Sequence, residues 1–117
     1  MSKNILKRIL KNQNHSSKAK KLCLENLNLA EFHLIDVREK SVFCLTPHIK
    51  GAINISSLEK LQEFCQCHKN KKILLTCNGG LEAAKYGTKL IEAGFDEIYF
   101  LDEYLQIIQD YLPIETP

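Results

Sequence analysis

Four short, mostly apolar runs constrain the fold of this 117-residue chain more than any other feature of its sequence. Each run has the length of a strand and is apolar at consecutive positions, so both of its faces are expected to be buried. Buried strands that alternate with helices are typical of a parallel sheet with helices on both faces. The runs are FHLIDV at 32–37, GAINI at 51–55, KILLT at 72–76 and EIYFL at 97–101.

Helix signals fill the intervals between these runs. Ser56 stands three residues before Glu59, which is the spacing of a capping box at a helix start. Gly94 suits the position just after a helix end, and Pro113 stops the last helix. The expected helices are a short one from Ser41 and longer ones over 56–67, 81–93 and 103–112. The predicted fold class is therefore α/β.

The start of the chain follows a different pattern. Seven lysines and arginines, and no acidic residue, lie between Ser2 and Lys21. The apolar residues at positions 5, 6, 9 and 10 predict an amphipathic helix over 1–12 with a basic outer face. We expect its apolar stripe to pack on the domain's own sheet. The alternative is a surface for an acidic protein partner or a membrane interface.

We divide the chain into a basic N-terminal segment, 1–30, and a domain over 31–117. The polar stretch NQNHSS at 12–17 is expected to be a loop. The stretch KAKKLCLENLNL at 18–29 fits a strand, because Leu22 and Leu24 alternate, and it also fits a helix that has Leu24 and Leu27 on one face. Both alternatives remain open for this stretch.

Composition excludes several classes of protein. Hydrophobic residues make up 44% and charged residues 26% of the chain, the balance of a globular protein, and a net charge of +2 without tryptophan argues against a nucleic-acid partner. Five cysteines without a repeated spacing argue against a disulfide framework. No run approaches the ~18 consecutive apolar residues of a membrane span, and the start lacks the apolar run of a signal peptide. We therefore expect a cytoplasmic protein with reduced thiols.

Cys77 stands where the KILLT strand passes into the next helix through Asn78, Gly79 and Gly80. Ligands of parallel sheets bind at the carboxyl ends of strands. The first N–H groups of a helix have no internal partner, and two glycines allow successive amides to point toward one anion. Such amides are expected to lower the pKa of Cys77 below about 8.5 and make it a nucleophile. The other four cysteines are interpreted as structural.

Five segments in the same order resemble the single-domain rhodanese sulfurtransferases. Together they cover about residues 31–115, and they are LIDVRE (34–39), HIKGAINI (48–55), ILLTCNGG (73–80), LIEAGFDEIYFL (90–101) and LPIE (112–115). The resemblance implies a three-layer fold in which a five-stranded parallel sheet lies between helices. It also implies an enzyme that needs no metal or organic cofactor.

The resemblance implies a role for each matching residue. Cys77 would take a sulfane sulfur from thiosulfate or from a persulfide-carrying protein, and would pass it to a thiophilic acceptor. The loop around the persulfide would be formed by Asn78, Gly79, Gly80, Leu81, Glu82 and Ala83, whose amides over 78–83 would hold its charge. We expect Asp36, Arg38 and His48 to be structural residues of the motif that stay out of the chemical step.

Two positions depart from the family pattern. The loop after Cys77 has no arginine or lysine, and its one charged residue is Glu82, so we expect weak activity on thiosulfate. Asp102 and the residues after it stand where the family often has a Gly-Gly turn, and we expect Asp102 to cap the last helix.

Three other functions compete with sulfur transfer as interpretations of the sequence. A phosphatase needs an arginine six positions after the cysteine, and Ala83 stands there. Zinc binding by CQCH at 65–68 is disfavoured because two cysteines two apart on a helix lie about 200° around its axis. The alternative that stays open is a non-catalytic module that docks a protein partner, in which the basic N-terminal helix would take part.

Overall fold

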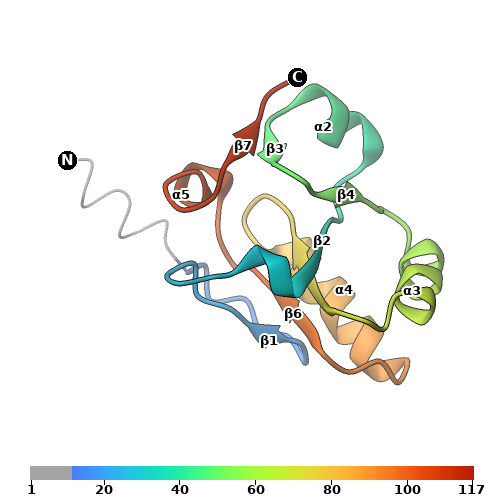
Figure 1. The fold of residues 1–117 in the computed structure, drawn as a ribbon. Helices are drawn as coiled ribbons and strands as arrows, with labels where there is room; N and C mark the ends of the chain where they lie inside the picture. The colour runs from blue at the N-terminus through green and yellow to red at the C-terminus, as the bar shows by residue number, and fades with distance from the viewer. Residues whose placement is uncertain (1–11) are drawn as a thin grey trace.

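Five parallel strands form the central sheet, in the order β1-β6-β5-β2-β4 (Figure 1). The computed structural model describes residues 12–117, so the helix predicted over 1–12 lies outside the described residues except for Asn12. The strands are β1 (Lys20–Lys21), β2 (Phe32–Asp36), β4 (Ile53–Asn54), β5 (Lys72–Thr76) and β6 (Ile98–Phe100). The predicted α/β class and the five-stranded parallel sheet are confirmed.

Helices cover both faces of the sheet (Figure 1). Two of them, α3 (Leu58–Cys67) and α4 (Leu81–Glu92), lie on one face. The other face carries α5 (Leu105–Ile108) and the short 3-10 helix η1 (Leu29–Glu31). Outside the sheet lie α2 (Lys40–Leu45) and an antiparallel pair, β3 (His48–Ile49) with β7 (Ile114–Glu115).

The core consists of two apolar layers that the sheet separates. Along β5, Ile73 and Leu75 pack in the layer under α3 and α4, whereas Leu74 packs in the layer under α5. This alternation follows from the two-residue period of a strand. Cys77 continues it and belongs to the layer under α4. Its thiol is therefore aimed at the start of the helix that follows it in the sequence.

The N-terminal segment supplies one edge of the sheet. Residues 20 and 21 pair with Tyr99 and Phe100 of β6, so the ambiguous stretch at 18–29 contains a strand. At the other edge, the strand expected from GAINI is confined to Ile53–Asn54. The expectation that this strand is buried on both faces was wrong, because the side chain of Ile53 at the sheet edge is 43% exposed.

The helix boundaries follow local hydrogen bonds. The hydroxyl of Ser57, not Ser56, caps α3 by accepting from the N–H of Lys60 at 3.1 Å, so the predicted capping box starts one residue too early. Gly94 adopts a left-handed backbone with φ +97°, and the N–H of Phe95 donates to the carbonyl of Leu90. This is the predicted glycine-terminated end of α4.

The last helix differs from its prediction. Only Leu105–Ile108 are α-helical, and turns continue over residues 109–111. The expectation that Asp102 caps this helix was wrong: the N–H of Leu105 donates to the Asn78 side chain at 3.2 Å. The carboxylate of Asp102 is drawn away from the helix by His15 and Lys21, which bind it directly.

A membrane-spanning helix needs about 20 residues that are mostly apolar. The longest helix within residues 12–117, α4, has 12 residues. None of the described helices combines the length and the apolar character that crossing a bilayer requires.

Gly87, inside α4, lies against the N-terminal segment. A β-carbon there would stand 2.6 Å from the Cβ of Ala19. Although Gly→Ala inside a helix usually stabilises by about 1 kcal/mol, we expect Gly87→Ala to lower the free energy of unfolding by about 1–3 kcal/mol through overpacking. Urea denaturation measures this change. Adding Ala19→Gly should restore part of the loss, and a Gly87→Ala protein more stable than the wild type would contradict the contact.

Candidate active site

Cys77 lies in the turn between β5 and α4, with its side chain only 3% exposed. The N–H of Ala83, in the first turn of α4, donates to its sulfur at 3.4 Å. The turn is tight because Gly79 and Gly80 both adopt left-handed conformations, with φ +91° and +86°. Residues with a β-carbon rarely adopt this conformation. The two glycines thus bring the start of α4 back over the cysteine.

Two opposing effects set the pKa of the Cys77 thiol, and the pKa is raised from its usual value. Burial is the largest effect, since it destabilises the thiolate. Hydrogen bonds from the backbone N–H groups of Ala83, Gly80 and Glu82 lower the pKa. The expected lowering was therefore wrong in direction, because the sequence reveals the amides but not the cost of burying the sulfur beneath them.

The acidic side chain that acts on Cys77 is Asp36 and not Glu82, the charged residue of the loop. The negative charge of Asp36, at the end of the neighbouring strand β2, raises the pKa of Cys77. The side chain of Glu82 is exposed in the first turn of α4. At this exposed position, water screens the charge of Glu82.

The residues of the loop divide between those that face the sulfur and those that hold the loop in place. The N–H of Gly79 donates to the carbonyl of Glu103 at 3.1 Å, so Gly79 supplies a conformation rather than an amide for the sulfur. The side chain of Asn78 accepts from Leu105. Leu81 is 45% exposed at the surface.

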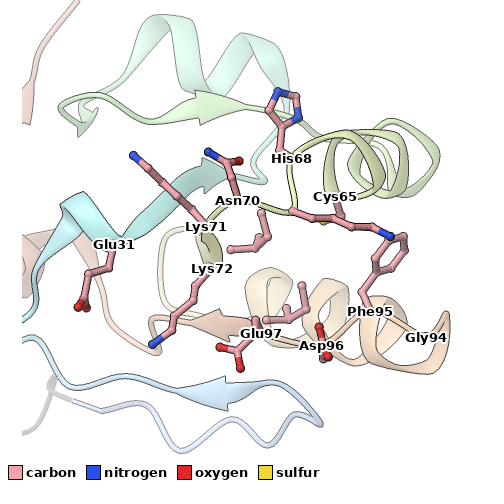
Figure 2. A pocket seen from close by; sticks show the side chains of 13 residues that line it. Glu31, Cys65, His68, Asn70, Lys71, Lys72, Gly94, Phe95, Asp96 and Glu97 are labelled. Atoms are coloured by element: carbon pink, nitrogen blue, oxygen red, sulfur yellow. The ribbon is translucent and has the colours of Figure 1, made fainter.

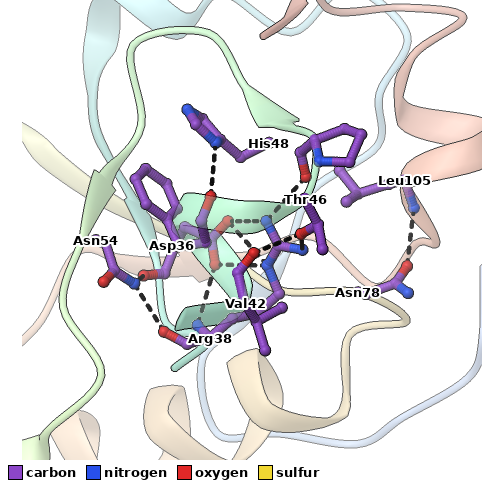
Figure 3. A network of polar contacts seen from close by, with 10 residues as sticks. Asp36, Arg38, Val42, Thr46, His48, Asn54, Asn78 and Leu105 are labelled. Atoms are coloured by element: carbon purple, nitrogen blue, oxygen red, sulfur yellow. Dashed lines mark hydrogen bonds and ion pairs between the residues drawn. The ribbon is translucent and has the colours of Figure 1, made fainter. Parts of the chain in front are cut away.

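Asp36 and Arg38 form a buried, bidentate ion pair beside the loop (Figure 3). The guanidinium donates to both carboxylate oxygens of Asp36 over distances of 2.8–3.1 Å. It also donates to the hydroxyl of Thr46 and the carbonyl of Pro47. These contacts occupy Nε, Nη1 and Nη2, so the guanidinium is engaged in fixing the end of β2 against the segment after α2.

The ends of β2 and β4 are joined by a side-chain amide. Asn54 donates from its Nδ2 to the carbonyls of Asp36 and Arg38, at 3.0 and 2.7 Å (Figure 3). His48 lies further out on β3. Its ring stacks on Phe43 with centroids 3.9 Å apart, and its Nδ1 lies 3.2 Å from the Phe43 carbonyl.

A cavity of about 360 Å³ opens beside the loop. Among the described residues, the charged side chain that lines it is Arg38, whose charge Asp36 balances. The rest of the wall is neutral, with contributions from Val42, Thr46, Asn78, Leu105, Gln106 and Gln109. No sequence signal marks the residues of α2 and α5 in this wall, because the tertiary fold alone brings these two helices to the loop.

A larger cavity, about 630 Å³, lies at the amino-terminal ends of the strands, opposite the end where Cys77 lies (Figure 2). Lys72 and Ile73, which line it, begin β5, whereas Cys77 follows its end. Five residues of strand span roughly 16 Å, so this cavity is separate from the cysteine site. Cys65 also lines it, and burial raises the pKa of that thiol to about 11.

Histidine, cysteine and acidic side chains within residues 12–117 do not gather into any group of three or more that could hold a metal ion. The two cysteines of CQCH differ in environment, since Cys65 is buried and Cys67 is exposed.

A parallel sheet with a cysteine held beneath the first turn of a helix at its carboxyl edge defines a thiol-centred α/β protein. The chain belongs to the rhodanese-like domain family, whose model matches residues 19–106. This match begins at β1 and extends into α5.

Curated relatives carry the name thiosulfate sulfurtransferase GlpE. The Vibrio cholerae protein is 29% identical over 70 residues, which are 60% of this chain and 65% of the relative. The Coxiella burnetii protein is 33% identical over 69 residues, which are 58% of this chain and 63% of the relative. The similar region thus spans somewhat less than two thirds of either relative.

Two solved structures are similar to the fold. The solution structure of protein hp1203 from Helicobacter pylori has a TM-score of 0.73 and 30% identity, covering 82% of this chain and 88% of that one. The rhodanese-like domain of an Anabaena protein has a TM-score of 0.61 and 24% identity, covering 74% and 67% of the two chains.

The raised pKa makes a prediction about alkylation. The iodoacetamide reaction of Cys77 should keep accelerating as the pH rises past about 8.5, the usual thiol value, because burial keeps the thiol neutral at lower pH. Peptide mass spectrometry separates Cys77 from the exposed Cys23, Cys44 and Cys67. Glu82→Gln should leave this pH profile unchanged. A rate that levels off below pH 8 would show that the amides outweigh burial.

Proposed function

We propose that the protein is a sulfurtransferase that carries a sulfane sulfur on Cys77. The observation that supports this most is the convergence of the Ala83, Gly80 and Glu82 N–H groups on the Cys77 sulfur. Preorganised amides of this kind stabilise negative charge that develops on a reacting atom. The relatives named thiosulfate sulfurtransferase support the same chemistry.

The proposed first step is the attack of the Cys77 thiolate on the outer sulfur of the donor. The thiol first loses its proton to solvent. With thiosulfate as donor, an S–S bond forms between Cys77 and the outer sulfur while the S–S bond of thiosulfate breaks. The electron pair of the broken bond leaves with sulfite, and the protein keeps a persulfide anion. Charge balances without any electron donor.

In the second step, a thiophilic acceptor attacks the outer sulfur of the persulfide. The S–S bond to Cys77 breaks, and its electron pair returns to Cys77 as a thiolate. A negative charge sits on sulfur in both the persulfide and the released thiolate. The loop amides would stabilise this charge throughout the cycle, which offsets part of the cost of burying it.

The neutral wall of the 360 Å³ cavity indicates which sulfur donor the site favours. A dianion such as thiosulfate gains most from an unpaired cation, whereas Arg38 already binds Asp36. We therefore infer weak thiosulfate activity, and a persulfide carried by a small molecule or a protein as the better donor.

The cytoplasmic location, the boundary at residue 31 and a partner for the N-terminal helix stay predictions.

A specific observation favours a second candidate, a non-catalytic module that docks a protein partner. Cys77 is 3% exposed and its pKa is raised, both of which disfavour a resting nucleophile. In that case the loop would serve only to shape the surface, and Cys77 would take up no sulfur.

Intact mass after incubation with a sulfur donor separates the two candidates. We expect the protein to gain about 32 Da on Cys77, removable by cyanide, because one sulfur atom is transferred per active cysteine. Cys77→Ala should abolish the gain. Cys65→Ala, which alters the other buried cysteine, is the matched control and should keep it. Uptake of sulfur at Cys65, or none at Cys77, would refute the proposal.

A further inference from the structure

A buried acidic pair, Asp102 and Glu103, forms the floor of the Cys77 loop. Asp102 follows β6 at the same edge of the sheet as Cys77 and is 1% exposed. A β-carbon on Gly80 would lie 2.6 Å from the Cα of Asp102 and closer still to its carboxylate. The neighbouring Gly79 donates its N–H to the Glu103 carbonyl. The position of Asp102 therefore fixes the position of Gly80.

The partners of the Asp102 carboxylate come from the N-terminal segment. One oxygen accepts from the backbone N–H of His15 at 2.7 Å and from Nζ of Lys21 at 2.8 Å. The other lies 2.7 Å from Nδ1 of His15. Burial raises the pKa of Asp102, but the bonds from Lys21 and His15 outweigh it, and the pKa is lowered. The carboxylate is thus ionised, and its partners His15 and Lys21 both come from the N-terminal segment.

The backbone just before His15 is shaped for the same contact. The N–H of Gln13 donates to the Asp102 carbonyl, and the N–H of Asn12 donates to the Glu103 carboxylate, both at 2.9 Å. Asn12 and Asn14 adopt left-handed conformations, with φ +56° and +64°. Asparagine tolerates that region better than most residues, so this turn presents several N–H groups to the acidic pair.

The same segment is also fixed to α4, the helix that begins at the loop. The hydroxyl of Ser17 donates to the Ala84 carbonyl at 2.7 Å, and the N–H of Lys18 donates to the Thr88 hydroxyl at 3.0 Å. Residues 12–21 therefore connect the floor of the loop to the helix whose first turn carries the N–H groups that face Cys77.

We infer that residues 12–21 clamp the Cys77 loop, with Asp102 as a positioning residue for sulfur transfer. This inference rests on the proposed function. Lys21 and His15 hold the Asp102 carboxylate, which holds Gly80 and so aims the loop amides at the sulfur. Removing either donor leaves a buried charge less well paired, which is costly and displaces the carboxylate toward water.

The test compares lysine variants of one short segment. Lys21→Gln should lower kcat for persulfide formation about tenfold, with KM within about twofold, since small displacements of a reacting group are costly. Lys21→Arg should restore most of the rate. Lys18→Gln is the matched control and should leave kcat unchanged, because it removes only an exposed side chain that pairs with Glu92 and keeps the backbone N–H that donates to Thr88. His15→Ala is a second, milder variant, expected to lower kcat about threefold.

Amide hydrogen exchange provides a readout that needs no activity. Lys21→Gln should speed exchange at residues 80–83 about tenfold, while β5 amides exchange as in the wild type. Equal acceleration throughout the domain, or no change at 80–83, would overturn the clamp and leave Lys21 a general stabiliser. If the wild-type protein transfers no sulfur, the proposed function fails, and the exchange rates alone decide the clamp.

Discussion

The burial of the Cys77 sulfur beneath the first turn of α4 is the constraint on which the rest of the site depends. A thiolate at that depth is destabilised by the loss of water, and the N–H groups of Ala83, Gly80 and Glu82 supply the compensation that the loop offers. These amides can converge only because two consecutive glycines adopt left-handed conformations. A single β-carbon at Gly80 would meet the Asp102 backbone, so the loop, the helix and the sheet edge have to fit together.

Two buried carboxylates frame the cysteine, one from each neighbouring strand. Asp36 is the last residue of β2 and is neutralised by Arg38, which fixes the segment after α2 (Figure 3). Asp102 follows β6, forms an ion pair with Lys21, and lies within hydrogen-bond distance of the His15 ring. Each carboxylate is placed by the register of parallel strands, and each pairs with a cation: Asp36 with Arg38, which follows β2, and Asp102 with Lys21, which lies on the edge strand β1. The reactive loop is thus held by charge pairs on both sides, while the cavity beside it stays close to neutral.

The inner strands β2, β5 and β6 were predictable because they are continuous apolar runs, and the position of Cys77 at a strand end follows from the same pattern. The edge strand β1 was not, because it consists of two exposed lysines. The end of α4 was predictable because Gly94 acts through its own backbone. Other features depend on contacts distant in sequence. The role of Asp102 depends on His15 and Lys21, which precede it in the sequence by 87 and 81 positions. The direction of the Cys77 pKa depends on burial, which no local motif reports. The cavity wall likewise requires α2 and α5 to be in place.

Amide NMR of the ¹⁵N-labelled protein tests most directly whether the loop amides hold the Cys77 sulfur. Spectra before donor, after donor and after cyanide should show the proton resonances of Gly80, Glu82 and Ala83 moving downfield when the persulfide forms and returning when it is removed. Gly79, whose N–H donates to Glu103, should move less. A persulfide verified by mass that leaves the resonances of Gly80, Glu82 and Ala83 unmoved would contradict the account.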